Sequence, residues 1–339
     1  MPPRNINTGQ TVNGNRWNIV VWIGCLGLLF LFGSCSSAPT IYRSDRCIVY
    51  QVKEGDTPES LAREFLETPD LAWMIEDENR GASFQPGSFI TIPLAPENKA
   101  GLAPDGYQVV PVLCYHHFGT ACDSPLCIPA DIFEKQMQYL DDNGFRVISL
   151  TRLYEFLQYR QNIPDKAVVI TIDDGYRSVY EIAYPVLKKH GFSATLFIYT
   201  DFVGKSSSAV TWEQLQEMKG AGFEIGSHTL SHCDLAKKRE GEETPVYETR
   251  IQQELVLSKQ ILDEKLKQNT IYFAFPYSSF NQRVLTICDQ AGYRLALTVK
   301  RGGNPFFSDP MLLRRNQILK KDMDSFARNL NTFHSVSLR

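Results

Sequence analysis

Two short motifs in this chain carry side chains that could bind a metal ion and hydrolyse an amide or an ester. Asp173 and Asp174 end an apolar run and precede Gly175, and His228 and His232 follow later in the chain. Successive side chains of a strand alternate sides, so one carboxylate can bind a cation while the other serves a second role. On one helical turn the two histidines would share a face and hold one ion. These residues predict an Asp/His/His metal site with a spare carboxylate, which suits metal-assisted hydrolysis.

Each motif alone also has an ordinary interpretation. An Asp-Asp-Gly sequence is often only a turn, and two histidines at this spacing are often a surface pair. In this chain, however, the apolar run 167–172 ends at the carboxylates, and the run 223–227 ends at His228. Groups at the carboxyl ends of successive parallel strands meet on one face of an α/β barrel. The joint occurrence of the two motifs therefore favours the metal site.

The region 108–335 has the alternating pattern that such a barrel requires. Repeated strand-then-helix units predict parallel strands in a closed or nearly closed barrel. We expect strands at 109–115, 145–148, 167–172, 194–198, 223–227, 271–275 and 295–299, and helices at 132–143, 153–159, 182–190, 212–219, 252–267 and 282–290.

Three motifs in this region resemble the polysaccharide deacetylase domain of carbohydrate esterase family four. They are Thr171-Ile172-Asp173-Asp174-Gly175, Ser227-His228-Thr229 with His232, and Phe275-Pro276-Tyr277. The resemblance implies a distorted (β/α)7 barrel in which Asp174, His228 and His232 hold a divalent metal, usually Zn²⁺. It also implies that Asp173 is the general base and that the backbone N–H of Tyr277 contributes to the oxyanion site.

The chain departs from the family pattern at two points. Ala274 stands where many members carry an arginine that orients the catalytic aspartate, a form that resembles the branch acting on poly-N-acetylglucosamine. That likeness implies that an arginine after the last strand orients the aspartate instead, and we favour Arg315 over its neighbour Arg314. The usual downstream catalytic histidine is also missing. We expect His116 to replace that catalytic histidine, and the alternative is that His116 has a purely structural role.

Residues 48–94 predict a separate small module of βααβ order. Apolar strands at 48–52 and 89–93 flank two short segments with helical spacing. The segment resembles a LysM domain at Tyr50, Val52, Gly55-Asp56-Thr57, Leu61-Ala62, Asn79, Pro86-Gly87 and Ile92-Pro93. The resemblance implies binding of N-acetylglucosamine chains through the loop of Gly55, Asp56 and Thr57, and a LysM-like spacer without binding is the alternative. Residues 36–47 and 95–107 are expected to be linkers.

The N-terminus has the features of a targeting segment. Basic residues precede an apolar run over 19–32, which is short for a bilayer span and typical of a signal peptide. Small residues before Cys35 resemble the bacterial lipoprotein signal, which implies a signal over residues 1–35 and lipidation of Cys35. Ser36 implies sorting to the outer membrane, and an uncleaved membrane anchor is the alternative. The lipoprotein signal and the uncleaved anchor both predict an exported protein held at a membrane of the cell envelope.

Composition and cysteine usage agree with an exported globular protein. The 339 residues are 43% hydrophobic and 22% charged, which is ordinary for a soluble fold with one large core and a small module. A net charge of -3 without a long basic run argues against nucleic acid as a partner. Cys122 and Cys127 predict a short disulfide-closed loop rather than a zinc knuckle, because no second ligand pair follows them.

The expected activity follows from these residues and resemblances. Hydrolysis of an acetamide requires an activated carbonyl and an activated water, and a Lewis-acidic metal beside a carboxylate base supplies both. We therefore expect a metal-dependent de-N-acetylase acting on an N-acetylglucosamine polymer, either an exopolysaccharide or peptidoglycan. The alternatives are an O-acetyl esterase acting on a glycan and a non-catalytic carbohydrate-binding lipoprotein of the envelope.

Overall fold

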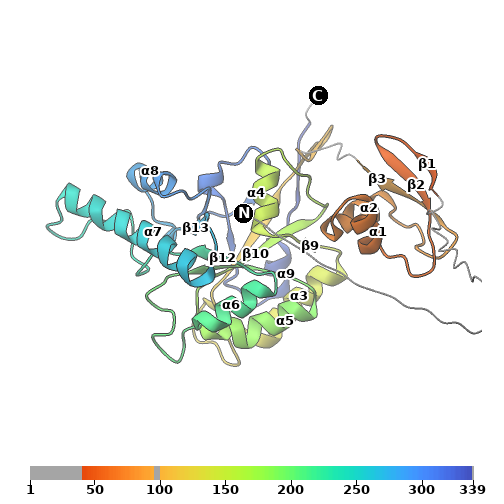
Figure 1. Cartoon of the computed structure of the whole chain (residues 1–339). Coiled ribbons are helices and arrows are strands. Elements are labelled where there is room, and N and C mark those ends of the chain that lie inside the picture. Colours follow the sequence, from red (N-terminus) through yellow and green to blue (C-terminus); the bar gives the residue numbers. More distant parts are fainter. Residues whose placement is uncertain (1–39, 95–99, 338–339) are drawn as a thin grey trace, which may run out of the picture. The chain divides into compact units, whose positions relative to one another are not determined.

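The structure, a computed structural model, describes residues 40–94 and 100–337 (Figure 1). The predicted signal segment with Cys35, and parts of both predicted linkers, lie outside these residues. Within the described ranges, no helix has the length and apolar character needed to cross a bilayer. The lipid anchor therefore stays a prediction.

The small module has the predicted order of elements and one additional strand. Its antiparallel sheet has the order β1-β2-β3, formed by β1 (Thr40–Arg43), β2 (Cys47–Gln51) and β3 (Phe89–Pro93). Between β2 and β3 lie α1 (Pro58–Phe65), a 3₁₀ turn (Pro69–Leu71) and α2 (Ala72–Glu78). The module has its own buried core, which includes Ile48, Tyr50, Leu61, Ile75, Ile90 and Ile92. Strand β1 occupies part of the predicted linker.

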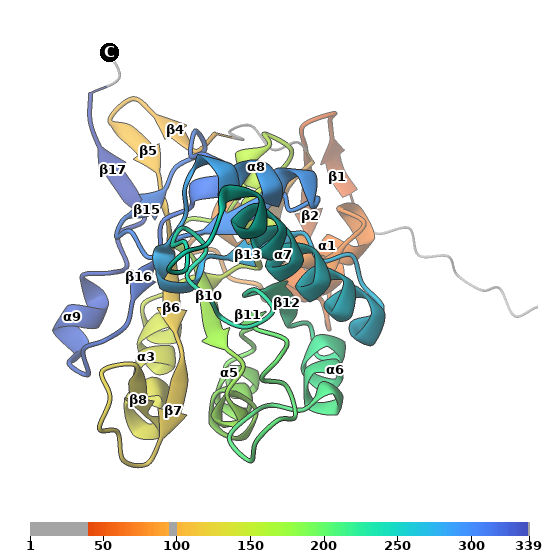
Figure 2. The same ribbon diagram turned by 90° about the vertical axis from the view of Figure 1, so that its left-hand side faces the viewer.

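A strongly curled sheet of parallel strands dominates the region 100–337 (Figures 1 and 2). Its parallel strands are, in sheet order, β6 (Val110–Tyr115), β10 (Ala167–Asp174), β11 (Thr195–Ile198), β12 (Glu224–Ser227), β13 (Tyr272–Ala274) and β14 (Leu295–Leu297). The short strand β9 (Arg146–Val147) also pairs with β10 in parallel. The prediction of an α/β fold with parallel strands is confirmed.

The segment 313–317 hydrogen-bonds to both edges of the curled sheet. At one edge, the N–H of Leu313 donates to the carbonyl of Ala296 at 3.0 Å. At the other edge, β16 (Asn316–Gln317) pairs with β6 in parallel, next to β15 (Gly303–Asn304), which pairs with β6 in the antiparallel sense. This segment thereby connects the two ends of the sheet, as a barrel-like arrangement requires.

The helices follow the strands as expected, with some shifted ends. They are α3 (Ala130–Asp142), α4 (Leu150–Leu157), α5 (Tyr184–Lys189), α6 (Trp212–Gly220), α7 (Thr244–Leu266), α8 (Gln282–Gln290) and α9 (Met323–Ala327). A π-helical turn (Val179–Ala183) precedes α5, and α7 begins eight residues before its predicted start, at Thr244 rather than Gln252.

The remaining short strands are β4 (Leu102–Ala103), β5 (Gly106–Gln108), β7 (His117–Gly119), β8 (Cys127–Pro129) and β17 (Phe333–Ser335). Strands β4 and β5 begin within the second predicted linker and form a sheet with β17.

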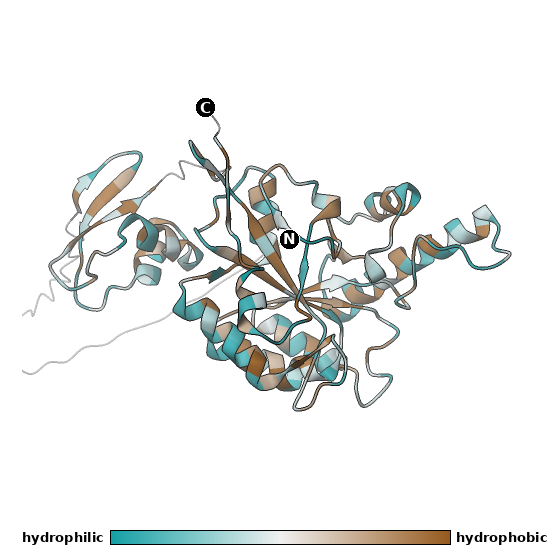
Figure 3. Cartoon of the chain, turned by 180° about the vertical axis from the view of Figure 1, so that it is seen from behind, coloured by the Kyte–Doolittle hydropathy of each residue, from teal (hydrophilic) through white to brown (hydrophobic). Residues whose placement is uncertain are grey.

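Alternation along β10 divides the core into two faces. Val168, Ile170 and Ile172 pack in a cluster with apolar residues of α3, α5 and α6. Ala167 and Val169 face the opposite way and pack with residues of α4 and β14. Figure 3 shows the strands of the curled sheet mainly in the hydrophobic colour, whereas the helices around them are mixed in colour. The same alternation sends consecutive residues at the end of β10 in different directions.

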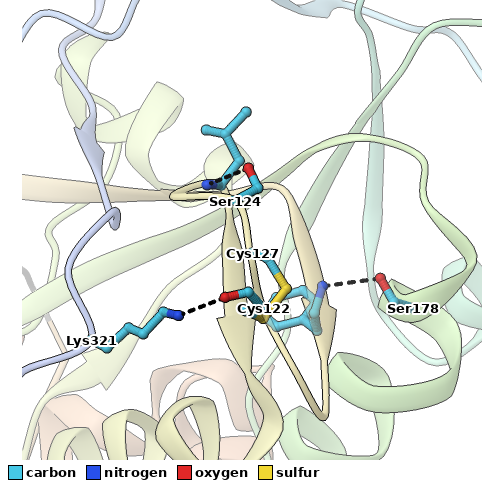
Figure 4. Close-up of a disulfide and its surroundings, with 7 residues drawn as sticks. Cys122, Ser124, Cys127, Ser178 and Lys321 are labelled. Carbon is cyan, nitrogen blue, oxygen red and sulfur yellow. Dashed lines mark hydrogen bonds between the residues drawn. A yellow bond between two sulfur atoms is a disulfide. The ribbon is translucent and has the colours of Figure 1, made fainter.

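A disulfide closes the loop between β7 and β8 (Figure 4). It joins Cys122 to Cys127, so the predicted disulfide loop is confirmed. The carbonyl of Cys122 accepts a hydrogen bond from Lys321 Nζ at 3.1 Å, and Ser178 Oγ accepts one from the N–H of Phe118 at 3.0 Å. These contacts tie the segment that follows His116 to two other parts of the sheet region.

We predict that the double variant Cys122→Ser/Cys127→Ser is less stable by about 2 kcal/mol, because a disulfide closing so short a loop restricts the unfolded chain only modestly. Guanidinium unfolding measures the difference. Reductant should lower the stability of the wild type to that of the variant and leave the variant unchanged. Equal stability of the oxidised wild type and the variant would contradict this role.

Candidate metal centre

The two adjacent carboxylates of β10 point to different partners. Asp173 contacts Arg315, with Arg315 Nη1 2.7 Å from Asp173 Oδ1. Asp174 contacts the histidines instead, with its Oδ1 3.6 Å from His228 Nε2 and 3.3 Å from His232 Nε2. The chain turns at Asp174 with a φ of 79°, and Gly175 follows at 90°. A turn with two successive positive φ values accounts for glycine at the second position.

The loop after β12 brings the two histidines to Asp174 without a helix. The expectation that His228 and His232 share a helical turn is wrong: Thr229 and His232 have φ values of 72° and 59°, and the loop is irregular. Because the backbone reverses locally, both imidazoles still face one point. Their Nε2 or Nδ1 atoms and a carboxylate oxygen of Asp174 lie within 4.8 Å of one another.

Glu254 of α7 holds this loop in place. Its Oε2 accepts hydrogen bonds from the backbone N–H groups of Leu230 and Ser231 at 3.0 and 2.9 Å, and its Oε1 accepts from Ser231 Oγ at 2.6 Å. Glu254 is buried, and these donors compensate for the loss of water around its carboxylate. Sequence reasoning missed this residue, because nothing local distinguishes it from the other glutamates of a long helix.

The donor set fits a divalent metal ion. Asp174 Oδ1 is buried and makes no hydrogen bond within the described ranges. His228 Nδ1 lies 2.7 Å from the carbonyl of Ala274, which can only accept, so Nδ1 carries the proton and Nε2 is free for a metal. Neighbouring ligand atoms of a tetrahedral zinc lie ~3.4 Å apart when the zinc–ligand bonds are about 2.1 Å long. The distances from Asp174 Oδ1 to Nε2 of His232 and of His228, 3.3 and 3.6 Å, are close to this value.

Electrostatics keeps these groups in the protonation states that bind metal. Burial alone raises the pKa of Asp174, but the neighbouring His232 and His228 outweigh it, and the pKa lies below its ordinary value. Burial lowers the pKa of His228, which favours the neutral imidazole. An ionised carboxylate and a neutral imidazole are the forms that a metal requires.

Asp173 and Arg315 form a buried, bidentate ion pair. The second contact joins Arg315 Nη2 to Asp173 Oδ2 at 2.8 Å, and both side chains are almost inaccessible to solvent. Arg315 Nε also donates to the carbonyl of Thr298 at 3.0 Å, and Nη1 donates to Thr171 Oγ1 at 3.2 Å. Burial raises the pKa of Asp173, but the guanidinium outweighs this effect and holds the pKa well below its ordinary value.

Of the two candidate arginines, the structure brings Arg315 to the carboxylate. Arg314 is exposed, and its Nη1 lies 3.4 Å from the carbonyl of Arg301. Cys114 completes the surroundings of Asp173, with Sγ 3.6 Å from Oδ2. This buried thiol was not anticipated from the sequence.

His116 lies on the Asp173 side of the centre. A ring nitrogen of His116, Cys114 Sγ and a carboxylate oxygen of Asp173 are all within 4.8 Å of one another. The adjacent His117 faces differently, with its ring centroid 4.9 Å from that of Tyr176. The half-buried His116 is therefore placed to exchange a proton near Asp173.

Tyr277 lies on the His232 side. It occupies a 3₁₀ turn (Pro276–Ser278) with a φ of 57°, and the residue is 68% exposed. Its hydroxyl lies 3.1 Å from His232 Nδ1. The contact of the phenol with a histidine of the cluster was not foreseen, because the sequence interpretation assigned only the backbone N–H of Tyr277.

In the small module, the predicted glycan-binding loop uses its side chains internally. The carboxylate of Asp56 accepts hydrogen bonds from the Tyr50 hydroxyl at 2.9 Å and from the N–H of Lys53 at 2.7 Å. Thr57 caps α1 through a hydrogen bond from the N–H of Ser60 at 3.1 Å. Gly55 has a φ of 87°, which favours glycine. The two side chains therefore fix the shape of this loop.

Comparison with known proteins connects this geometry to one family. The family model described as polysaccharide deacetylase matches residues 160–296, a range that contains both carboxylates, both histidines and Tyr277. The chain is 33% identical over 193 residues to the putative polysaccharide deacetylase YxkH of Bacillus subtilis (strain 168), covering 57% of this chain and 65% of that protein. It is 29% identical over 175 residues to the poly-beta-1,6-N-acetyl-D-glucosamine N-deacetylase of Staphylococcus aureus (strain MRSA252), covering 50% of this chain and 59% of that protein. The chain thus spans less than two thirds of the length of both curated relatives.

Two solved structures resemble the fold. The Streptococcus pyogenes deacetylase PplD in complex with acetate is 28% identical with a TM-score of 0.60, covering 67% of this chain and 99% of that one. IcaB from Ammonifex degensii is 28% identical with a TM-score of 0.58, covering 67% of this chain and 96% of that one.

We predict that Arg315→Met lowers the free energy of unfolding by about 3–5 kcal/mol, because removal of one partner leaves a buried charge without compensation. Chemical denaturation at neutral pH measures the loss. Arg314→Met is the matched control and should change the stability by less than about 0.5 kcal/mol, as expected for an exposed side chain. Equal effects of the two substitutions would contradict the assignment of Arg315.

The same ion pair predicts a pH dependence. Because the pKa of Asp173 is lower in the folded than in the unfolded protein, its stabilisation is present above the unfolded value of about 4 and is lost as the pH falls through the folded value. In Arg315→Met the effect of burial is unopposed, so the pKa of Asp173 should rise. A raised folded pKa reverses the sign of the linkage, because protonation of Asp173 then stabilises the folded variant. Denaturation between pH 3 and pH 7 (roughly the range that brackets ordinary carboxyl titration) should therefore show that the stability deficit of Arg315→Met relative to the wild type shrinks as the pH falls. A deficit that is the same at every pH would count against the pair.

Proposed function

We propose that this protein, whose matched domain belongs to the polysaccharide deacetylase family, is a metal-dependent hydrolase that removes N-acetyl groups from an N-acetylglucosamine polysaccharide at the cell envelope. The observation that carries the proposal is the cluster of Asp174, His228 and His232 directly beside the ion-paired Asp173. Zn²⁺ suits two imidazoles and one carboxylate that leave a position open for substrate or water.

Each residue of the centre has a distinct part in this proposal. A bound metal supplies Lewis acidity, which polarises the acetyl carbonyl and acidifies water. Asp173 accepts the proton of the attacking water, and Arg315 keeps its carboxylate ionised and fixed in orientation. The backbone N–H of Tyr277 stabilises the oxyanion.

His116 is the proposed general acid. Cleavage of the C–N bond produces an amine that must gain a proton before it leaves. The position of His116 beside Asp173 supports this role. The proton that Asp173 accepts from water is then close to His116, which can pass a proton to the leaving amine. The downstream histidine that other family members use is missing from this sequence.

Aromatic side chains around the centre favour a sugar as substrate. The rings of Tyr176, Phe202, Tyr199, His232 and Tyr277 form a continuous series, with neighbouring centroids between 4.8 and 5.4 Å apart. Partly exposed aromatic rings present apolar faces with polar edges, which match the alternating apolar and hydroxyl-bearing surfaces of a pyranose. The names of the curated relatives support the same class of substrate.

The small module and the N-terminus extend the proposal. We infer that the βααβ module is a LysM domain that holds the same polymer through the loop of Gly55, Asp56 and Thr57. The proposed lipoprotein signal, with Cys35 as the lipidated residue, places the enzyme at the membrane, where envelope polysaccharide is the available substrate. Exopolysaccharide and peptidoglycan both contain the required acetamide.

Acetate release from a panel of acetylated glycans tests the proposed function. The full chain, loaded with Zn²⁺, should release acetate from N-acetylglucosamine oligomers and much less from an O-acetylated xylan. His228→Ala should lower the release by at least about 100-fold, since it removes a metal ligand. Acetate from the xylan alone would indicate an O-acetyl esterase. Binding to chitin or peptidoglycan without acetate release from any substrate would indicate a carbohydrate-binding protein.

A further inference from the structure

We propose that the segment 274–277 orients both histidines of the metal centre and that the Tyr277 phenol is a positioning residue for His232. The inference rests on the proposed metal site and goes beyond the backbone role assigned to Tyr277. Its basis is that the Nδ1 atoms of both histidines meet oxygen atoms of this one segment, at 2.7 Å for the carbonyl of Ala274 and 3.1 Å for the Tyr277 hydroxyl.

The two contacts have the same consequence for the two imidazoles. A neutral imidazole has one N–H and one lone pair, and a partner at Nδ1 determines which nitrogen remains for a metal. The carbonyl of Ala274 fixes His228 in the Nδ1–H form. A phenolic oxygen that accepts from His232 Nδ1 does the same, and it leaves Nε2 facing Asp174 Oδ1 at 3.3 Å. Such partners orient metal-binding histidines and strengthen their binding.

His232 depends on this partner more than His228 does. The side chain of His228 is 3% exposed, whereas that of His232 is 23% exposed and lies in a loop. The His232 ring lies between two tyrosines, with centroids 5.2 Å from Tyr199 and 4.8 Å from Tyr277. Only the Tyr277 hydroxyl makes a hydrogen bond to this ring among the residues that the structure describes.

The backbone around Tyr277 is built to present this side chain. Tyr277 and Ser278 both have positive φ values, of 57° and 56°, which non-glycine residues seldom adopt. The turn is held by a hydrogen bond from the N–H of Ser278 to the carbonyl of Phe275 at 3.0 Å, and the Ser278 hydroxyl accepts one from the N–H of Val299 at 3.0 Å. Because the Tyr277 ring is largely exposed, burial of apolar area does not account for this conformation.

The test separates the phenol from the backbone N–H. Tyr277→Phe keeps the ring and the main chain and removes only the hydroxyl. Competition with a zinc chelator should show a 10–100-fold weaker zinc affinity for this variant. Tyr199→Phe is the matched control, since it removes a phenol from the other ring beside His232, and its zinc affinity should be unchanged.

The outcomes distinguish this inference from the proposed function. Zinc binding by the wild type, together with unchanged affinity in Tyr277→Phe, would overturn the positioning role and leave the metal centre intact. Equal losses of affinity in Tyr277→Phe and Tyr199→Phe would also overturn it, because a general packing effect would then explain both. Failure of the wild type to bind zinc would overturn the metal centre and the inference together. Unfolding curves establish that each variant is folded before titration.

Discussion

The buried ion pair of Asp173 and Arg315 is the interaction on which the centre depends. It joins the end of β10, in the middle of the sheet, to the segment 313–317, which hydrogen-bonds to both sheet edges. Taking two charges out of water costs several kcal/mol for each ion, and bidentate geometry with additional hydrogen bonds is the arrangement that offsets the cost. Thr298 and Thr171 supply those additional partners for the guanidinium. The segment that hydrogen-bonds to both sheet edges therefore also carries the side chain that orients the Asp173 carboxylate.

The division of work between two adjacent carboxylates follows from the strand. Alternation turns Asp173 toward Arg315, and the turn at Gly175 directs Asp174 toward the histidines. Different neighbours lower the pKa of the two carboxyl groups, Arg315 for Asp173, and His232 and His228 for Asp174. Asp173 lies ionised beside a fixed cation, as the proposed base requires, and Asp174 presents a buried oxygen to two imidazoles, as the proposed metal ligand requires.

Sequence patterns predicted the elements well where apolar periodicity dominates. Strand β10 and helix α8 were expected almost at their observed bounds, because an apolar run and an amphipathic repeat reflect burial directly. The helical turn predicted for residues 228–232 was wrong, since spacing alone does not reveal positive φ values. Glu254 and the phenol of Tyr277 act through tertiary contacts, which leave no local pattern. Arg315 was expected only because a family resemblance pointed to it, and its burial could not be read from its polar neighbours.

We propose that Asp174 binds the metal while Asp173 acts as the base beside it. Zinc content and acetate release, measured together on Asp173→Asn and Asp174→Asn, test this division most directly. Asp173→Asn should keep close to one zinc per chain and lose acetate release, whereas Asp174→Asn should lose both. Loss of zinc from Asp173→Asn to the same degree, or acetate release by Asp173→Asn at the wild-type rate, would contradict it.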